Sequence, residues 1–229
     1  MRSQSNRQSS FLYRAHSGFT SPPVETWISR LRTRQSFASM AGCGAGGVLS
    51  RRRLFQLLDA LMAKPIIWIG GGRGVGKTTL VASYIAARGI RGIWFRASRI
   101  DRQELQDRLR SLRAPDVLIL DGYESVRLDS PLHETLPELA RGTPRGSHLV
   151  LIGRGEPPAL YAPLVANGML APLPGSELLI TEDEARSLSS GLSVDDWSIR
   201  ALHQQCGGWA TGIALGLQYV QQHRCNGEL

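Results

Sequence analysis

Short apolar runs alternate with segments of helical periodicity along much of this chain. Apolar runs of the buried-strand type occupy residues 65–69, 92–97, 117–120 and 148–152. Segments whose apolar residues recur at helical spacing occupy residues 51–62 (with Ser50 as a candidate N-cap), 79–88, 102–112, 132–140 and 158–166. Strands that alternate with helices in this way predict βαβ units, and therefore a parallel sheet flanked by helices on both faces.

The pattern changes after residue 177. Thr181 and Glu184 have the spacing of a capping box, in which the first side chain caps a helix and the second bonds back to its start. Helical periodicity then predicts three helices, over residues 181–189, 194–206 and 209–223. We therefore expect an α/β core over residues 49–176, followed by a small helical lid subdomain over residues 177–229.

Between the first strand and the helix at 79–88, the chain fits the phosphate-binding loop pattern G-x-x-x-x-G-K-[ST] at every fixed position. A chance match is the alternative, but the flanking strand and helix are the context that this loop requires. Glycines let successive N–H groups face one point, where the helix N-terminus adds the positive end of its dipole. Lys77 is expected to reach the β- and γ-phosphates, and the Thr78 hydroxyl to hold Mg²⁺. The predicted nucleotide-binding residues are Gly71, Gly72, Arg73, Gly74, Val75, Gly76, Lys77, Thr78 and Thr79.

Asp121 follows the apolar run at 117–120 and is the expected second element of a nucleotide site. Open α/β sheets bind ligands at the carboxyl edge of their strands, where this carboxylate would hold Mg²⁺ together with Thr78. The alternative is that Asp121 only begins a turn with Gly122. The phosphate loop favours the metal role.

Two further side chains are candidates for catalysis at the terminal phosphate. Many hydrolytic P-loop enzymes carry a carboxylate directly after the metal aspartate, but here that position is Gly122. Glu124 is a candidate to replace it, with a solvated loop residue as the equal alternative, so we expect slow hydrolysis at most. Arg154 follows the strand at 148–152, where its guanidinium would meet the γ-phosphate; a surface arginine is the alternative.

The formal net charge of +8 is confined to the beginning of the chain. Residues 1–53 hold nine arginines and one acidic residue, Glu25, whereas the remainder holds 18 basic and 18 acidic residues. We interpret residues 1–48 as a basic, disordered N-terminal arm, because they are rich in Ser, Arg and Gly and weak in periodicity. The alternative is an arm that contacts nucleic acid.

Cysteine use and hydropathy indicate the compartment. The three cysteines form no C-x-x-C pair, which favours a reducing compartment over a disulfide framework or a zinc site. No apolar run approaches the roughly 18 residues that a membrane span needs. We expect a cytoplasmic protein with no membrane partner.

Four segments together resemble the nucleotide-binding domain of STAND-class signal-transduction ATPases, specifically the large LuxR-type and maltose-activator-type transcriptional regulators. Residues 48–54 resemble the family's first helix, residues 70–84 its phosphate loop and residues 118–126 its Mg²⁺ strand. The fourth segment runs from LVLIGRGEPP at 149–158 through LLITEDEARSL at 178–188 to GGWATGIAL at 207–215. It resembles the family's ordered stretch of S-R-x-x-P-P, L-x-x-T-x-E-E-A and G-W-x-x-G-L, which is the most specific part of the resemblance.

The resemblance implies ATP as the nucleotide, with Mg²⁺, and a switch whose ATP-bound form self-associates until hydrolysis or ADP resets it. It implies that Arg154 is the sensor arginine, although Gly153 stands where the family has serine. It also implies that Gly208, Trp209 and Gly212 open a helix close to the adenine, whereas residue type alone makes Trp209 a core aromatic.

We therefore expect an ATP-binding regulatory switch domain that binds ATP or ADP and associates with itself or with a regulator chain. The family's sensor repeats and helix-turn-helix domain are not recognisable in the sequence, so we expect a fragment, a decayed gene product or a stand-alone switch. One alternative is a small-molecule P-loop kinase, but such kinases need an arginine-rich lid and residues 181–190 contain only Arg186. The other alternative is a nucleic-acid-binding protein that uses the basic arm. A GTPase is not expected, because no N-K-x-D segment follows the last predicted core strand.

Overall fold

The computed structural model of the protein describes residues 51–192 and 194–225, and the arm predicted over residues 1–48 lies outside them. In this part of the chain, five strands form one sheet in which all paired strands run parallel, as predicted. Their order is β2-β3-β4-β1-β5, so β4 lies between the strand that precedes the phosphate loop and the strand that ends in Asp121. The strands are β1 (Ile66–Ile69), β2 (Gly92–Arg96), β3 (Val117–Asp121), β4 (His148–Ile152) and β5 (Leu170–Leu173).

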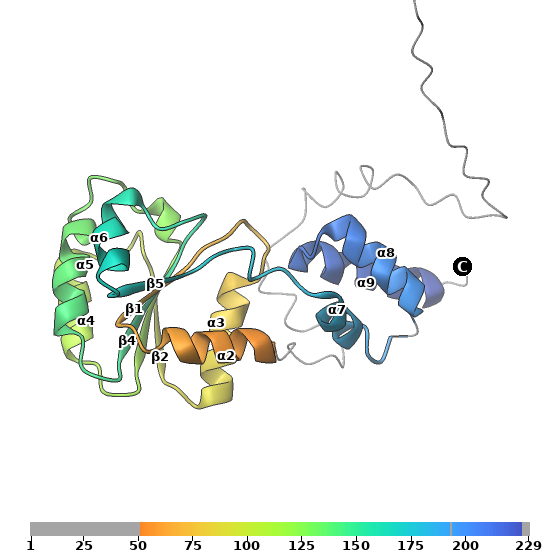
Figure 1. Ribbon diagram of the computed structural model, residues 1–229, viewed down its shortest axis with the longest axis horizontal. Coiled ribbons are helices and arrows are strands. Elements are labelled where there is room, and N and C mark those ends of the chain that lie inside the picture. Colours follow the sequence, from red (N-terminus) through yellow and green to blue (C-terminus); the bar gives the residue numbers. More distant parts are fainter. Residues whose placement is uncertain (1–50, 193, 226–229) are drawn as a thin grey trace, which may run out of the picture. The chain divides into compact units, whose positions relative to one another are not determined.

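Helices cover both faces of the sheet, because each strand presents alternate side chains to opposite faces. Ile66 and Trp68 of β1 belong to the core with α4, α5 and α6, whereas Ile67 and Ile69 belong to the core with α2 and α3. Figure 1 shows these two groups of helices on opposite sides of the sheet. The helices are α2 (Arg52–Leu61), α3 (Lys77–Arg88), α4 (Arg102–Arg110), α5 (Pro131–Gly142) and α6 (Ala162–Ala166).

The strand β5 is the element that the sequence did not predict. Pro172 lies within it, and a proline has no N–H group to donate to a neighbouring strand, which argues against a strand. However, β5 lies at the edge of the sheet and pairs only with β1, where Pro172 is exposed and in register with Trp68. An edge strand needs ladder hydrogen bonds on one side only, so proline is tolerated there.

Several helix boundaries also differ from the prediction by a few residues. Arg51 occupies the N-cap position of α2 without a side-chain cap, and Ser50 lies outside the described residues. The helix predicted over residues 158–166 is divided into a 3₁₀ turn, η3 (Ala159–Tyr161), and the short helix α6.

A second, smaller core lies among the three helices that follow the sheet. The predicted capping box is confirmed: the Thr181 hydroxyl accepts from the Glu184 N–H at 3.2 Å, and the Glu184 carboxylate accepts from the Thr181 N–H at 3.0 Å. The helices are α7 (Glu182–Leu188), α8 (Asp196–Cys206) and α9 (Ala210–Cys225), and the buried residues between them are Ile180, Ala185, Ile199, Ile213 and Leu217. None of the helices in the described ranges is long and apolar enough to cross a bilayer.

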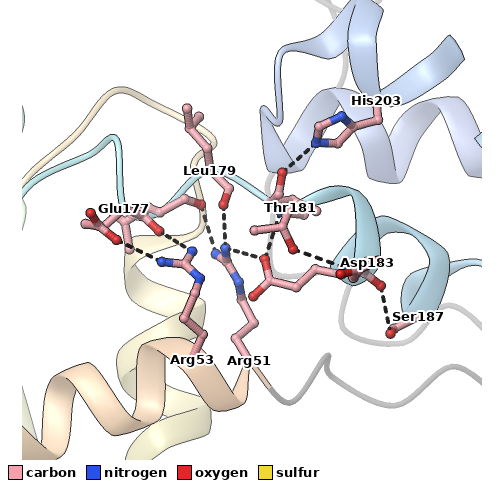
Figure 2. A network of polar contacts seen from close by, with 11 residues as sticks. Arg51, Arg53, Glu177, Leu179, Thr181, Asp183, Ser187 and His203 are labelled. Atoms are coloured by element: carbon pink, nitrogen blue, oxygen red, sulfur yellow. Dashed lines mark hydrogen bonds and ion pairs between the residues drawn. The ribbon is translucent and has the colours of Figure 1, made fainter. Parts of the chain in front are cut away.

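The segment between the sheet and α7, residues 177–181, is bonded to the start of α2, and we call it the hinge segment. The buried Arg51 guanidinium donates to the carbonyls of Leu178 and Leu179 at 2.9 and 2.8 Å and to the Glu184 carboxylate at 2.8 Å (Figure 2). Beside it, Arg53 donates to the carboxylate and the carbonyl of Glu177. The Glu184 carboxylate therefore accepts hydrogen bonds both from the Thr181 N–H of the capping box and from Arg51.

Candidate nucleotide-binding site

The carboxyl ends of β1, β4 and β3 lie level with one another in the sheet. Ile152 of β4 is in register with Ile69 of β1 and with Asp121 of β3. The chain leaves these strands as the phosphate loop (residues 70–76), the Arg154 loop (residues 153–158) and the Glu124 loop (residues 122–126). The strand order therefore puts the Arg154 loop between the other two, at the edge where open α/β sheets bind their ligands.

The phosphate loop turns from β1 into the N-terminus of α3, as the pattern predicted. Gly71, Gly74 and Gly76 have positive φ angles of 131°, 76° and 92°, and this backbone curls the loop. Val75 is buried and anchors the loop in the core with α2 and α3. The first N–H groups of α3 have no partner within their own helix, so they and the helix dipole favour an anion here. The exposed positions of this segment are Gly72, Arg73, Thr78 and Thr79.

Lys77 and Thr78, which end the pattern, both have polar partners at this edge. The Lys77 ammonium donates to the carbonyls of Gly71 and Gly72, both at 2.7 Å. The Thr78 hydroxyl donates to a carboxylate oxygen of Asp121 at 3.1 Å. The two residues predicted to hold Mg²⁺ are therefore adjacent, and both offer the oxygen ligands that this ion prefers.

Glu124 and Arg154 form an ion pair, with Oε1 and Nε 3.1 Å apart. Both side chains are partly exposed, so the pair contributes little to stability. Its importance is that it joins the Glu124 loop to the Arg154 loop at the candidate site. Burial lowers the pKa of Lys77, the carboxylates of Glu124 and Asp121 raise it, and the Arg154 guanidinium lowers it.

The lid contacts the phosphate loop directly. Thr211 donates through its N–H and its hydroxyl to the Gly74 carbonyl, at 3.0 and 2.9 Å. Trp209 donates through its indole N–H to the Arg73 carbonyl at 2.9 Å. A Cβ atom at Gly74 would lie 2.6 Å from the Thr211 hydroxyl oxygen and 2.8 Å from the indole nitrogen, so only glycine fits beneath the lid. The indole predicted beside the adenine therefore lies on the phosphate loop itself.

Two residues that contact the loops of this site were not predicted: Thr211, and Trp68, whose indole N–H donates to the Gly155 carbonyl. The role of Arg51 at the hinge segment was not predicted either. Thr211 stands at an unspecified position of the G-W-x-x-G pattern, and Arg51 is the first of three consecutive arginines in a basic stretch. Trp68 reads as an ordinary core residue of an apolar strand. None of them carries a local signal, because the role of each is defined by partners that are distant in sequence.

Comparisons with protein-family models and with curated proteins find no match for this chain. Solved structures do match. A RuvB variant from Thermotoga maritima has a TM-score of 0.56 at 15% identity, over 79% of this chain and 65% of that chain. The T. maritima RuvB Holliday junction branch migration motor has a TM-score of 0.51 at 17% identity, over 77% of this chain and 62% of that chain.

The Drosophila ORC bound to DNA is also similar, with a TM-score of 0.53 at 12% identity, over 94% of this chain and 66% of that chain. This chain spans less than two thirds of the length of each of these RuvB chains. At such low identity the likeness shows the fold alone. The chain has an α/β P-loop fold like that of these RuvB and ORC structures, and the predicted fold class is confirmed.

Proposed function

We propose that this chain is an ATP-binding regulatory switch domain that hydrolyses ATP slowly at most. The observation that carries the proposal is geometric: the Lys77 ammonium on the phosphate loop, the Thr78–Asp121 bond and the Glu124–Arg154 ion pair all lie at the carboxyl edge of the sheet. A triphosphate is a polyanion, and this edge of the sheet offers it main-chain N–H groups, a helix N-terminus and a lysine.

The residues present also fit the Mg²⁺ ion that accompanies a nucleotide. Thr78 and Asp121 would hold the ion, which supplies positive charge to the phosphates. Lys77 would exchange the carbonyls of the phosphate loop for phosphate oxygens. Arg154 would report the γ-phosphate, because a guanidinium matches the geometry of phosphate oxygens.

Slow hydrolysis is expected from the position of the carboxylates. Gly122 directly follows Asp121, so no carboxylate stands at the usual place of the water-orienting residue. Glu124 is the nearest replacement, and its carboxylate is paired with Arg154. A carboxylate oxygen that accepts from a guanidinium is not free to accept from a water molecule. We infer that Glu124 orients water only when Arg154 has exchanged it for phosphate.

The regulatory role is supported by the contacts of the lid and by the resemblance of residues 48–223 to STAND-class regulators. Thr211 and Trp209 bond the start of α9 to the phosphate loop, and Arg51 bonds the start of α2 to the hinge segment. A change at the nucleotide therefore has a direct physical connection to the lid.

A small-molecule kinase is less well supported. Such a kinase uses arginines of its lid to bind the transferred phosphate, and residues 181–190 contain only Arg186. Its guanidinium is already bonded to three carboxylates, those of Glu182, Asp183 and Asp196. Arg186 is therefore not free to bind a phosphate.

The site assignment is tested by the substitution Lys77→Ala, with Lys64→Ala as the matched control. Lys64 is the other lysine of the chain and lies exposed before β1. Removing a charged donor costs about 1.5–3 kcal/mol, so Lys77→Ala should weaken MgATP binding by roughly tenfold or more, and Lys64→Ala should not. Isothermal titration calorimetry with MgATP, MgADP and MgGTP measures this, and thermal unfolding checks that each variant is folded. Equal ATP affinity in Lys77→Ala and wild type would refute the site.

A further inference from the structure

Trp68 of β1 contacts two of the three loops of the candidate site, the Arg154 loop and the Glu124 loop. It is buried on the face of the sheet that carries α4, α5 and α6. Its indole N–H donates to the Gly155 carbonyl at 3.0 Å, one residue beyond Arg154. A side chain placed before the phosphate loop therefore holds the backbone of the Arg154 loop.

The same ring fills the space beside Gly153. A Cβ atom at this position would lie 2.6 Å from Cζ2 and 2.8 Å from Cη2 of Trp68, which is closer than Cβ atoms approach other atoms. Both carbons belong to the rigid six-membered ring of the indole, so no flexible end is available to move aside. A side chain at residue 153 and an indole at residue 68 are therefore mutually exclusive in this geometry.

On its other side, the indole contacts the Glu124 loop. Its ring packs edge-on against Tyr123, with centroids 5.5 Å apart and an interplanar angle of 78°. Tyr123 lies between Asp121 and Glu124 in sequence, so this contact fixes the backbone from which the Glu124 carboxylate reaches Arg154.

Tyr123 is itself held by a chain of buried hydrogen bonds. Its hydroxyl lies 2.6 Å from that of Tyr161, which contacts Nδ1 of His133. Nε2 of His133 faces the Arg127 carbonyl at 2.8 Å and therefore donates, which leaves Nδ1 of a neutral ring to accept. Burial raises the pKa of Tyr123 to about 12, so its hydroxyl stays protonated and is able to donate at neutral pH. These hydrogen bonds hold the Tyr123 ring in place, and the Trp68 indole packs against that ring.

We propose that Trp68 is a positioning residue for Arg154 and Glu124. It bonds to one loop, packs against the other, and occupies the space that a side chain at residue 153 would need. This inference rests on the proposed function, because it assigns Trp68 to the part of the site that distinguishes ATP from ADP. Displacing the indole should therefore change the preference for the γ-phosphate more than the binding of ADP.

The test approaches the contact from both sides, through Trp68→Phe and Gly153→Ser. Trp68→Phe removes the indole N–H and shortens the ring, whereas Gly153→Ser forces a Cβ atom against an intact indole. Each should lower the ratio of ATP to ADP affinity by about tenfold, the equivalent of one hydrogen bond of ~1.4 kcal/mol, with ADP affinity nearly unchanged. In Trp68→Phe/Gly153→Ser, the smaller ring leaves room for serine, so the combined loss should be smaller than the product of the two single losses.

Calorimetry with MgATP and MgADP gives the ratio, and thermal unfolding of all variants is measured in parallel. Trp94→Phe is the matched control, because Trp94 is an exposed residue of β2, at the far edge of the sheet from β1. A wild type that does not prefer ATP overturns both the proposed function and this inference. A wild type that prefers ATP, with the preference intact in either folded single variant, overturns the role of Trp68 alone. Because the two variants perturb the contact from opposite sides, one folded variant is sufficient to decide.

Discussion

The ion pair between Arg154 and Glu124 lies at the same edge of the sheet as two further formal charges, those of Lys77 and Asp121. Within this group the two cations and the two carboxylates balance each other. A γ-phosphate that enters it competes with Glu124 for Arg154, because both are anions that a guanidinium binds through the same N–H groups. The γ-phosphate and Glu124, the residue proposed to orient water, would therefore be alternative partners of Arg154.

The substitution Glu124→Gln tests this arrangement. An amide cannot accept the proton of the attacking water, so we expect ATP hydrolysis to slow by about a hundredfold, within the usual contribution of a general base. ATP affinity should be equal or higher, because a competing anion has been removed from Arg154. Phosphate release at saturating MgATP measures the rate. Glu156→Gln is the control, since Glu156 is an exposed carboxylate of the Arg154 loop. The same rate in Glu124→Gln and wild type would make Glu124 a solvated loop residue.

At the scale of the elements, helices α2 and α7 are connected at their first turns. Arg51 precedes α2, Glu184 lies in the first turn of α7, and the two side chains form a largely buried ion pair across the hinge segment. A buried arginine without its carboxylate is costly, whereas an exposed pair such as Arg53 with Glu177 contributes little. The ion pair between Arg51 and Glu184 therefore makes the connection between the starts of α2 and α7 depend on charge.

The substitution Glu184→Gln should reveal this dependence as a function of pH. Burial alone raises the pKa of Glu184, but the bonds from Arg51 and from the Thr181 N–H outweigh it, and the net pKa lies below the ordinary value of 4.5. A carboxylate with a lowered pKa stabilises the fold above its ordinary pKa, and this contribution is lost as pH falls through the lower folded value.

We therefore expect Glu184→Gln to lower the free energy of unfolding by roughly 2 kcal/mol at pH 7. Below pH 4.5, where the wild type loses this contribution, the difference between the two proteins should shrink. Urea unfolding at a series of pH values measures both effects. The matched control is Glu177→Gln, which removes the exposed carboxylate beside Arg53. A constant difference at all pH values would show that the loss is one of packing rather than charge.

At the scale of the whole molecule, side chains at the start of α9 donate hydrogen bonds to main-chain carbonyls of the phosphate loop. The carbonyls of Arg73 and Gly74 receive the side chains of Trp209 and Thr211, so the shape of the loop and the position of α9 are linked. A ligand that changes the shape of the loop must either keep these bonds or break them. The proposed switch would therefore have two states, one with these bonds formed and one with them broken.

The substitution Trp209→Phe removes the indole N–H that bonds to the Arg73 carbonyl and keeps an aromatic ring. We expect ATP affinity to fall by about fivefold, the effect of one hydrogen bond of ~1 kcal/mol. Any self-association that ATP induces should weaken with it. Light scattering after size-exclusion chromatography, with ATP and with ADP, measures the latter. Trp197→Phe provides the comparison, because Trp197 is an exposed residue of α8. If both variants behave as wild type does, the lid does not report the nucleotide through Trp209.

The parts of this molecule that were predictable are those whose signal is local in sequence. The phosphate loop, the four strands β1 to β4 and the capping box at Thr181 each rest on residues within a few positions of one another. Strand β5 was missed because Pro172 is incompatible with a central strand, and only the pairing of β5 with β1 alone makes it acceptable.

The sequence by itself determined that Lys77 and Thr78 stand at the start of a helix and that Asp121 stands at the end of an apolar strand. Apolar runs and glycine spacing shape the backbone within a few residues, so these local positions can be predicted without the tertiary structure. The sequence did not determine which strand ends are neighbours. The order β2-β3-β4-β1-β5 decided that Arg154 meets Glu124, and the packing of one indole against two loops decided that there is no space for a side chain at residue 153. These contacts join residues far apart in the chain, so they exist only once the sheet has formed.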